Sequence, residues 1–139
     1  MSQQNVEIVR RLFEVLNQGG ADAVVEAGFL SPKIVFDASR SGIPGVGVLH
    51  GREEVRRFFK DDWFAAFPFE EWEIQIDQPI GDGDRVIFKS RQHGRGRTSG
   101  AVAAALELGN IFTLSEGQVV RVTLFGRPEG AFEAAGLRE

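Results

Sequence analysis

The spacing of apolar residues changes along this chain, and the change restricts the fold more than any other feature. Near the N-terminus apolar side chains recur at helical intervals, with Val9, Leu12 and Leu16 on one stripe. From residue 72 onward they alternate with polar ones, as Ile74 and Ile76 do. The strands of this second part follow one another with only turns between them, such as the Gly-Asp-Gly-Asp of residues 81–84. The pattern therefore predicts the α+β class, with four consecutive antiparallel strands.

The expected elements fit one domain spanning residues 1–139. Domains are commonly about 100–150 residues long, and the sequence contains no repeat or linker. We expect helices over residues 5–16 and 21–29 and from residue 51 to just before Pro68. We expect strands over residues 33–38, 71–77, 85–94, 102–114 and 119–125, and a short helix or lid over residues 128–137.

Composition excludes several classes of function. The 42% of apolar and 26% of charged residues are typical of a soluble globular protein, and the absence of Cys excludes disulfides and thiolate nucleophiles. No apolar run reaches the ~20 residues that span a bilayer, and the first residues do not resemble a signal peptide. We therefore expect a cytoplasmic protein without membrane contact. The net charge of −4 argues against a nucleic-acid partner.

No pattern indicates a metal or a cofactor. The two histidines, His50 and His93, have no ligand spacing. The glycines at 45, 47 and 51 are spaced one residue too widely for a dinucleotide-binding motif, and no second βαβ unit follows them. We expect neither a bound metal nor a cofactor.

Two polar residues are candidates for chemistry. Asp37 stands where a short strand meets a glycine-rich loop, and its carboxylate either acts on a substrate or accepts hydrogen bonds that shape the loop. Asn110 shares a strand face with Leu108 and Phe112. Its amide is either satisfied by neighbouring groups or directed into a cavity as a donor.

Five segments resemble one superfamily. They are residues 11–19 (RLFEVLNQG), 34–37 (IVFD), 50–59 (HGREEVRRFF) and the pair 111–114 and 119–122 (IFTL and VVRV). Together they resemble the nuclear-transport-factor-2-like superfamily, and within it the SnoaL-like and ketosteroid-isomerase-like branch. The resemblance implies a cone in which a strongly curved, mostly antiparallel sheet and three N-terminal helices enclose one deep apolar pocket, usually in a homodimer.

Residue by residue, the resemblance places the isomerase base at Asp37. The isomerase's two pocket tyrosines fall on Phe13 and Phe59, and its protonated aspartic acid falls on Asn110. The chain thus keeps the base but lacks the strong donors that stabilise an enolate, because Phe donates nothing and an amide donates weakly. A SnoaL-like cyclase needs chiefly one carboxylate in an apolar cavity, which Asp37 would provide.

Two classes of function remain open. The first is an isomerase or cyclase that transfers a proton on an apolar carbonyl compound, with Asp37 as base and Asn110 polarising the oxygen. The second is a non-catalytic protein that binds an apolar small molecule or acts as an accessory dimer. In both cases we expect homodimerisation through the outer sheet face, and a pocket lined by Phe13, Leu16, Val35, His50, Phe58, Phe59, Trp63, Phe88, Phe112 and Phe125.

Overall fold

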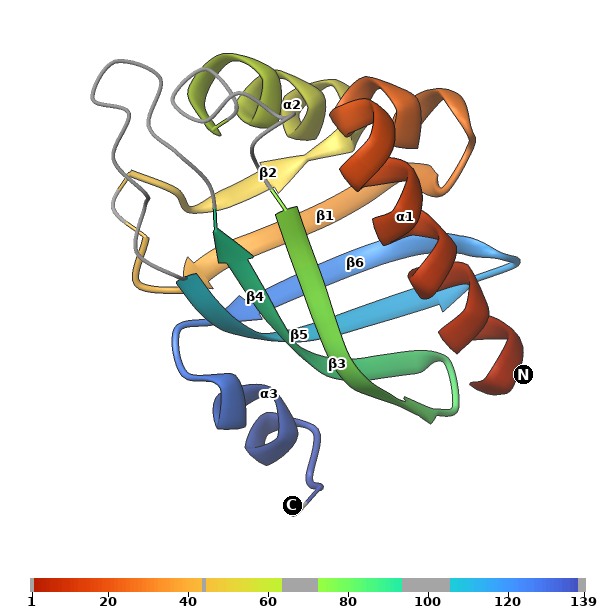
Figure 1. Cartoon of the computed structure of the whole chain (residues 1–139), viewed down its shortest axis with the longest axis vertical. Coiled ribbons are helices and arrows are strands. Elements are labelled where there is room, and N and C mark those ends of the chain that lie inside the picture. The colour runs from red at the N-terminus through yellow and green to blue at the C-terminus, as the bar shows by residue number, and fades with distance from the viewer. Residues whose placement is uncertain (1, 44, 64–72, 94–105, 138–139) are drawn as a thin grey trace.

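The computed structural model describes residues 2–43, 45–63, 73–93 and 106–137. Within these ranges the chain forms one six-stranded sheet with the strand order β2-β1-β6-β5-β4-β3 (Figure 1). The elements are α1 (Ser2–Glu26), β1 (Leu30–Arg40), β2 (Val48–His50), α2 (Gly51–Arg57), the π-helical turn η1 (Phe58–Trp63), β3 (Glu73–Asp82), β4 (Arg85–His93), β5 (Leu106–Ser115), β6 (Gln118–Phe125) and α3 (Pro128–Ala134).

The strand order confirms the predicted meander. Strands β3, β4, β5 and β6 pair with their chain neighbours in antiparallel fashion. Strand β1 is the exception, because it lies parallel to β6, with Phe36 opposite Val122. The predicted α+β class and the curved, mostly antiparallel sheet are thus confirmed, and the sheet does not close on itself.

The segment labelled α1 contains two helices, as the sequence predicts. The predicted helices cover residues 5–16 and 21–29, and between them Gly20 is non-helical, with φ 76° and ψ −170°, while the second helix ends at Glu26. Glycine adopts such a positive φ without the steric cost that a side chain would add. The bend directs the last turns of α1 across the end of the sheet beside α2 (Figure 1).

The helices cover opposite faces of the sheet. Helix α1 packs against β3 and β4, and α2 packs against β1, so both enclose the main apolar core on the concave face. Helix α3 packs on the other face, where Phe125, Phe132 and Ile87 form a second cluster. A Cβ on Gly109 of β5 would lie 2.7 Å from the Pro128 carbonyl oxygen, so this glycine permits the close approach of α3. The C-terminal segment is therefore a helix on the outer face and not a lid over the core.

A side chain of α1 satisfies the open edge of β3. Asn17 Nδ2 donates to the Ile74 carbonyl at 2.9 Å, and the Ile74 N–H donates to Asn17 Oδ1 at 3.0 Å. The carboxamide thus occupies the place of a neighbouring strand at Ile74, where the backbone would otherwise be unpaired.

Among the described helices, none combines the length and the apolar composition that a membrane span requires.

Candidate functional site

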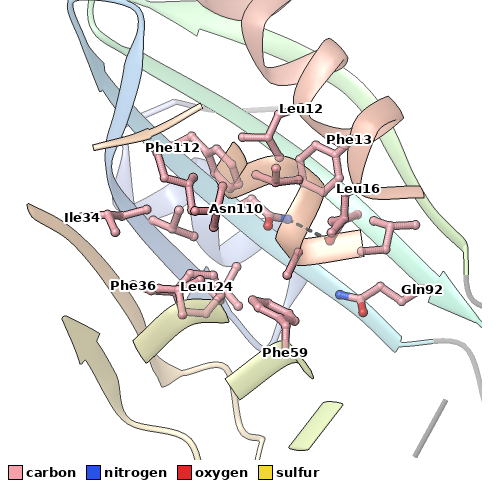
Figure 2. Close-up of a pocket in the computed structure, with 18 residues that line it drawn as sticks. Leu12, Phe13, Leu16, Ile34, Phe36, Phe59, Gln92, Asn110, Phe112 and Leu124 are labelled. Atoms are coloured by element: carbon pink, nitrogen blue, oxygen red, sulfur yellow. Dashed lines mark hydrogen bonds between the residues drawn. The ribbon is translucent and has the colours of Figure 1, made fainter. Parts of the chain in front are cut away.

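A pocket of about 90 Å³ lies between the concave sheet face, α1 and α2 (Figure 2). Its walls come from every layer around the core, since helical residues meet inward-facing residues of β1, β3, β4, β5 and β6. The lining residues are Leu12, Phe13, Leu16, Ala21, Val24, Val25, Leu30, Ile34, Phe36, Val55, Phe59, Ile74, Ser90, Gln92, Asn110, Phe112, Val122 and Leu124. The pocket is therefore almost wholly apolar, as small-molecule sites commonly are.

Three neutral polar side chains interrupt the apolar wall. Ser90 and Gln92 stand two residues apart on β4 and so face the same way, and Asn110 stands on the neighbouring strand β5. Asn110 and Ser90 are almost fully buried, with 3% and 4% of their surface exposed. In Figure 2 the Gln92 side chain extends toward the pocket from the side opposite Ile34.

The hydrogen bonds of these residues leave part of their capacity unused. Asn110 Nδ2 donates to Ser90 Oγ at 2.9 Å and to the Leu108 carbonyl at 3.3 Å, so both of its N–H bonds are engaged. Within the described residues, Asn110 Oδ1 and the Ser90 hydroxyl hydrogen have no partner. Gln92 Oε1 is buried and has no partner there either. A buried polar group without a partner marks a place where a ligand or a water completes the bonding.

Aromatic rings form the floor and one wall of the pocket. Phe13 and Phe112 lie on Phe88, with ring centroids 5.5 and 5.2 Å from it. Phe36 and Phe59 meet edge to face at 5.6 Å. A smaller cavity of about 30 Å³ shares both of these rings with the main pocket. The pair thus forms part of a partition between the two spaces.

No ionisable side chain lines this pocket in the described part of the chain. An acid or base that acts on a bound molecule must reach it within hydrogen-bond distance or through one water. The described lining residues therefore offer hydrogen bonds and apolar contacts but no proton donor or acceptor with a suitable pKa.

Asp37 lies outside the pocket, and the prediction that it faces the cavity is wrong. Its neighbours Phe36 and Ala38 face the core, so alternation directs Asp37 to the outer face of β1. There its Oδ1 accepts from Ser39 Oγ at 2.6 Å and from the Ser39 N–H at 3.0 Å, and Arg121 Nη2 donates to Oδ2 at 3.2 Å. The bonds from Ser39, with Arg121 and Arg40 nearby, lower the pKa of Asp37. A general base buried in an apolar cavity would have a raised pKa instead.

The other predicted pocket residues divide into two groups. Phe13, Leu16, Phe59 and Phe112 line the main pocket, and Phe58 lines the smaller cavity. Phe88 is wholly buried beneath Phe13 and Phe112, Val35 and Phe125 point to the outer face, and His50 is exposed at the start of α2. The side chain of Trp63 lies outside the described residues.

Ser90 and Gln92 were absent from the predicted site, although a signal for them exists. The alternation along β4 places Val86 and Phe88 inward, and the same period places Ser90 and Gln92 inward as well. Two polar residues that continue an apolar strand face are thus a sign of a polar patch within a pocket.

A metal site finds no support in the described residues, where no three His, Asp or Glu side chains lie close enough to share an ion. The phosphate-binding loops that cofactor sites use are equally missing from the sequence.

The comparison with known families identifies the chain. The SnoaL-like domain family matches residues 9–122. The chain belongs to this family. No curated protein sequence matches it.

Solved structures resemble this SnoaL-like protein over most of its length. A proposed SnoaL-like polyketide cyclase from Jannaschia sp. CCS1 is 26% identical, with 89% of this chain and 85% of that chain covered and a TM-score of 0.68. Bal32a, from a soil-derived mobile gene cassette, is 20% identical, with 96% of both chains covered and a TM-score of 0.72. A proposed ketosteroid isomerase from Kribbella flavida DSM 17836 is 18% identical, with 89% and 78% covered and a TM-score of 0.65. The last two similarities concern the fold alone.

Proposed function

We propose that this SnoaL-like protein binds a neutral, mostly apolar small molecule in the pocket between α1, α2 and the concave sheet face. The supporting observation is the composition of the wall, in which the polar groups among the described residues are only Ser90, Gln92 and Asn110. Transferring an uncompensated charge into such a wall is strongly unfavourable, whereas an apolar molecule gains from the transfer.

Proton-transfer chemistry of the isomerase or cyclase kind has one supporting observation, the 26% identity to the proposed polyketide cyclase from Jannaschia. Asp37 is no candidate for its base, because the sheet separates this carboxylate from the pocket. Asn110 is no candidate for polarising a substrate carbonyl in the present arrangement, because Ser90 and Leu108 already receive both of its N–H bonds. Binding is thus the function that the described residues support best.

The test compares two Phe substitutions at adjacent positions of β6. Val122 lines the pocket, whereas Thr123 is not among the lining residues and points to the opposite face. Val122→Phe therefore fills the pocket, and Thr123→Phe adds the same ring outside it. Toluene, phenol and cyclohexanone are titrated while backbone amide NMR shifts and melting temperature are measured.

We expect at least one of the three compounds to raise the melting temperature and to shift the amide signals of Asn110 and Phe112. Val122→Phe should abolish both effects, and Thr123→Phe should retain them. If none of the three binds to the unmodified protein, or if both variants lose binding equally while folded, the proposed pocket function is wrong.

A further inference from the structure

We infer that the ligand carries a neutral hydroxyl group on a body of about one six-membered ring, and that Ser90 and Asn110 bind this hydroxyl. The inference rests on the proposed function, since it names the chemical class that the same pocket selects. It is carried by the unused hydrogen-bonding capacity of the buried residues and by the size of the cavity.

Ser90 and Asn110 together have one free hydrogen-bond donor and one free acceptor within the described part of the chain. The Ser90 Oγ accepts from Asn110, so its hydrogen remains to be donated, and Asn110 Oδ1 remains to accept. The free donor and the free acceptor thus belong to two side chains that are hydrogen-bonded to each other at 2.9 Å. A hydroxyl group accepts and donates through a single oxygen, so it satisfies both. Gln92, whose Oε1 has no partner among the described residues, stands two positions along β4 as a further donor and acceptor.

Ketones, ethers and anionic groups fit these two residues less well than a hydroxyl group does. A ketone or an ether would accept from Ser90 but leave Asn110 Oδ1 unsatisfied, and each buried group left in this state weakens binding by roughly tenfold. A carboxylate or phenolate would enter a wall in which no described residue carries a positive charge. Burial of such an uncompensated anion favours its neutral form. Among groups with a single oxygen atom, only the neutral alcohol or phenol both donates and accepts.

The volume of the pocket limits the size of the ligand. An apolar cavity of about 150 Å³ holds one benzene molecule, and the main pocket measures about 90 Å³. The pocket is thus smaller than the cavity that holds benzene, so a single ring is the upper limit and requires the wall to move slightly. The smaller cavity of about 30 Å³ lies beyond the Phe36 and Phe59 rings, and so this partition is where a longer ligand would gain space.

The test measures dissociation constants for four single-ring compounds by NMR titration at pH 6, where phenol is neutral. Phenol carries a hydroxyl, anisole an ether oxygen, benzaldehyde a carbonyl and toluene no polar group. We expect phenol to bind the unmodified protein at least tenfold more tightly than each of the other three.

Two variants assign this preference to the site. Asn110→Leu removes the acceptor and should bring phenol to within about threefold of toluene. Thr113→Val removes a hydroxyl from the same strand, and Thr113 is absent from the pocket lining, so the preference should remain. If Asn110→Leu does not fold, the comparison of the four compounds with the unmodified protein decides by itself.

The outcomes separate the inference from the proposed function. If toluene and anisole bind as tightly as phenol, the pocket is functional and the hydroxyl inference is overturned. The same holds if Asn110→Leu folds and keeps the full preference for phenol. If no compound binds, the proposed function itself is overturned.

Discussion

At Asp37 the hydrogen-bonding neighbours, more than burial, determine the state of the carboxylate. Ser39 donates twice to Oδ1 and Arg121 donates to Oδ2, and these interactions stabilise the charged form. The residue thus shapes the end of β1, where the register with β6 shifts between Asp37 and Arg40. This local role is the structural alternative that the sequence left open.

Asp37→Asn should lower the free energy of unfolding by about 1 kcal/mol at pH 7, the scale of one lost hydrogen bond or partly exposed ion pair. Because the pKa of Asp37 is lowered in the folded protein, its stabilisation is present above the ~3.9 of a free Asp and is lost as the pH falls through the folded pKa. The difference between the two proteins should therefore shrink at pH 3 and below. Urea denaturation at pH 7 and pH 3 measures it.

The matched control is Asp84→Asn in the exposed turn before β4, for which we expect little change at either pH. Binding of phenol or toluene should be the same for Asp37→Asn as for the unmodified protein. A loss of ligand affinity in the folded variant would contradict the position of Asp37 outside the pocket.

The face to which Asp37 points was beyond the reach of the sequence for a physical reason. Ile34, Val35 and Phe36 are all apolar, so the strand has no alternation that distinguishes its two faces. Only the structure shows that Ile34 and Phe36 face the pocket. The same ambiguity misplaced Phe125, because α3 covers the outer face there and favours apolar residues on it.

At the scale of elements, the sequence pattern predicted a strand best where one face of that strand is exposed to solvent. The alternation in residues 72–77 predicted β3, and the turn residues at 81–84 predicted its hairpin with β4. The glycine signal located the helix break at Gly20, but the second helix ends at Glu26 and not at residue 29, because the turn with Gly28 at a φ of 81° follows it. The parallel contact between β1 and β6 joins distant segments, so no local pattern reports it.

The junction of α1 with the edge of β3 leads to a prediction at this scale. Asn17→Leu should lower the free energy of unfolding by about 2 kcal/mol, because two hydrogen bonds at roughly 1 kcal/mol each are lost. Asn5→Leu is the matched control on the same helix, since its only hydrogen bond in the described part of the chain, to the Gly83 carbonyl, is long at 3.4 Å and exposed.

Chemical denaturation measures the free energy of unfolding of both variants, and amide hydrogen exchange shows which part of the structure is destabilised. Asn17→Leu should accelerate exchange at Ile74, whose N–H donates to Asn17. Equal destabilisation by the two variants would show that the contact at Ile74 has no special role.

At the scale of the molecule, the homodimer stays a prediction. The sequence places Ile111, Thr113 and Glu107 on the outer sheet face, through which the dimer is expected to form. In the structure Ile111 packs against the cluster beneath α3, and Glu107 pairs with Arg91 at 3.3 Å. Thr113 lies opposite Arg121 on the outer face of the sheet. An interface on this part of the sheet should bury about 800 Å² per partner.

Sedimentation velocity should therefore show a dimer for the unmodified protein and a monomer for Thr113→Arg, because the new charge would be buried without a partner. Glu129→Arg, on the exposed side of α3, should stay dimeric. A monomer at every concentration of the unmodified protein would contradict the prediction.

The pairing of β1 with β6 has a consequence for the order of events during protein synthesis. Leu30 lies opposite Val119 and Arg40 opposite Phe125, so β1 pairs with β6, a strand that is synthesised only after β3, β4 and β5. While the ribosome is still adding the middle of the chain, β1 has only the three-residue strand β2 to pair with. The meander β3 to β5 can assemble locally, but the two halves of the pocket come together only after β6 has been synthesised.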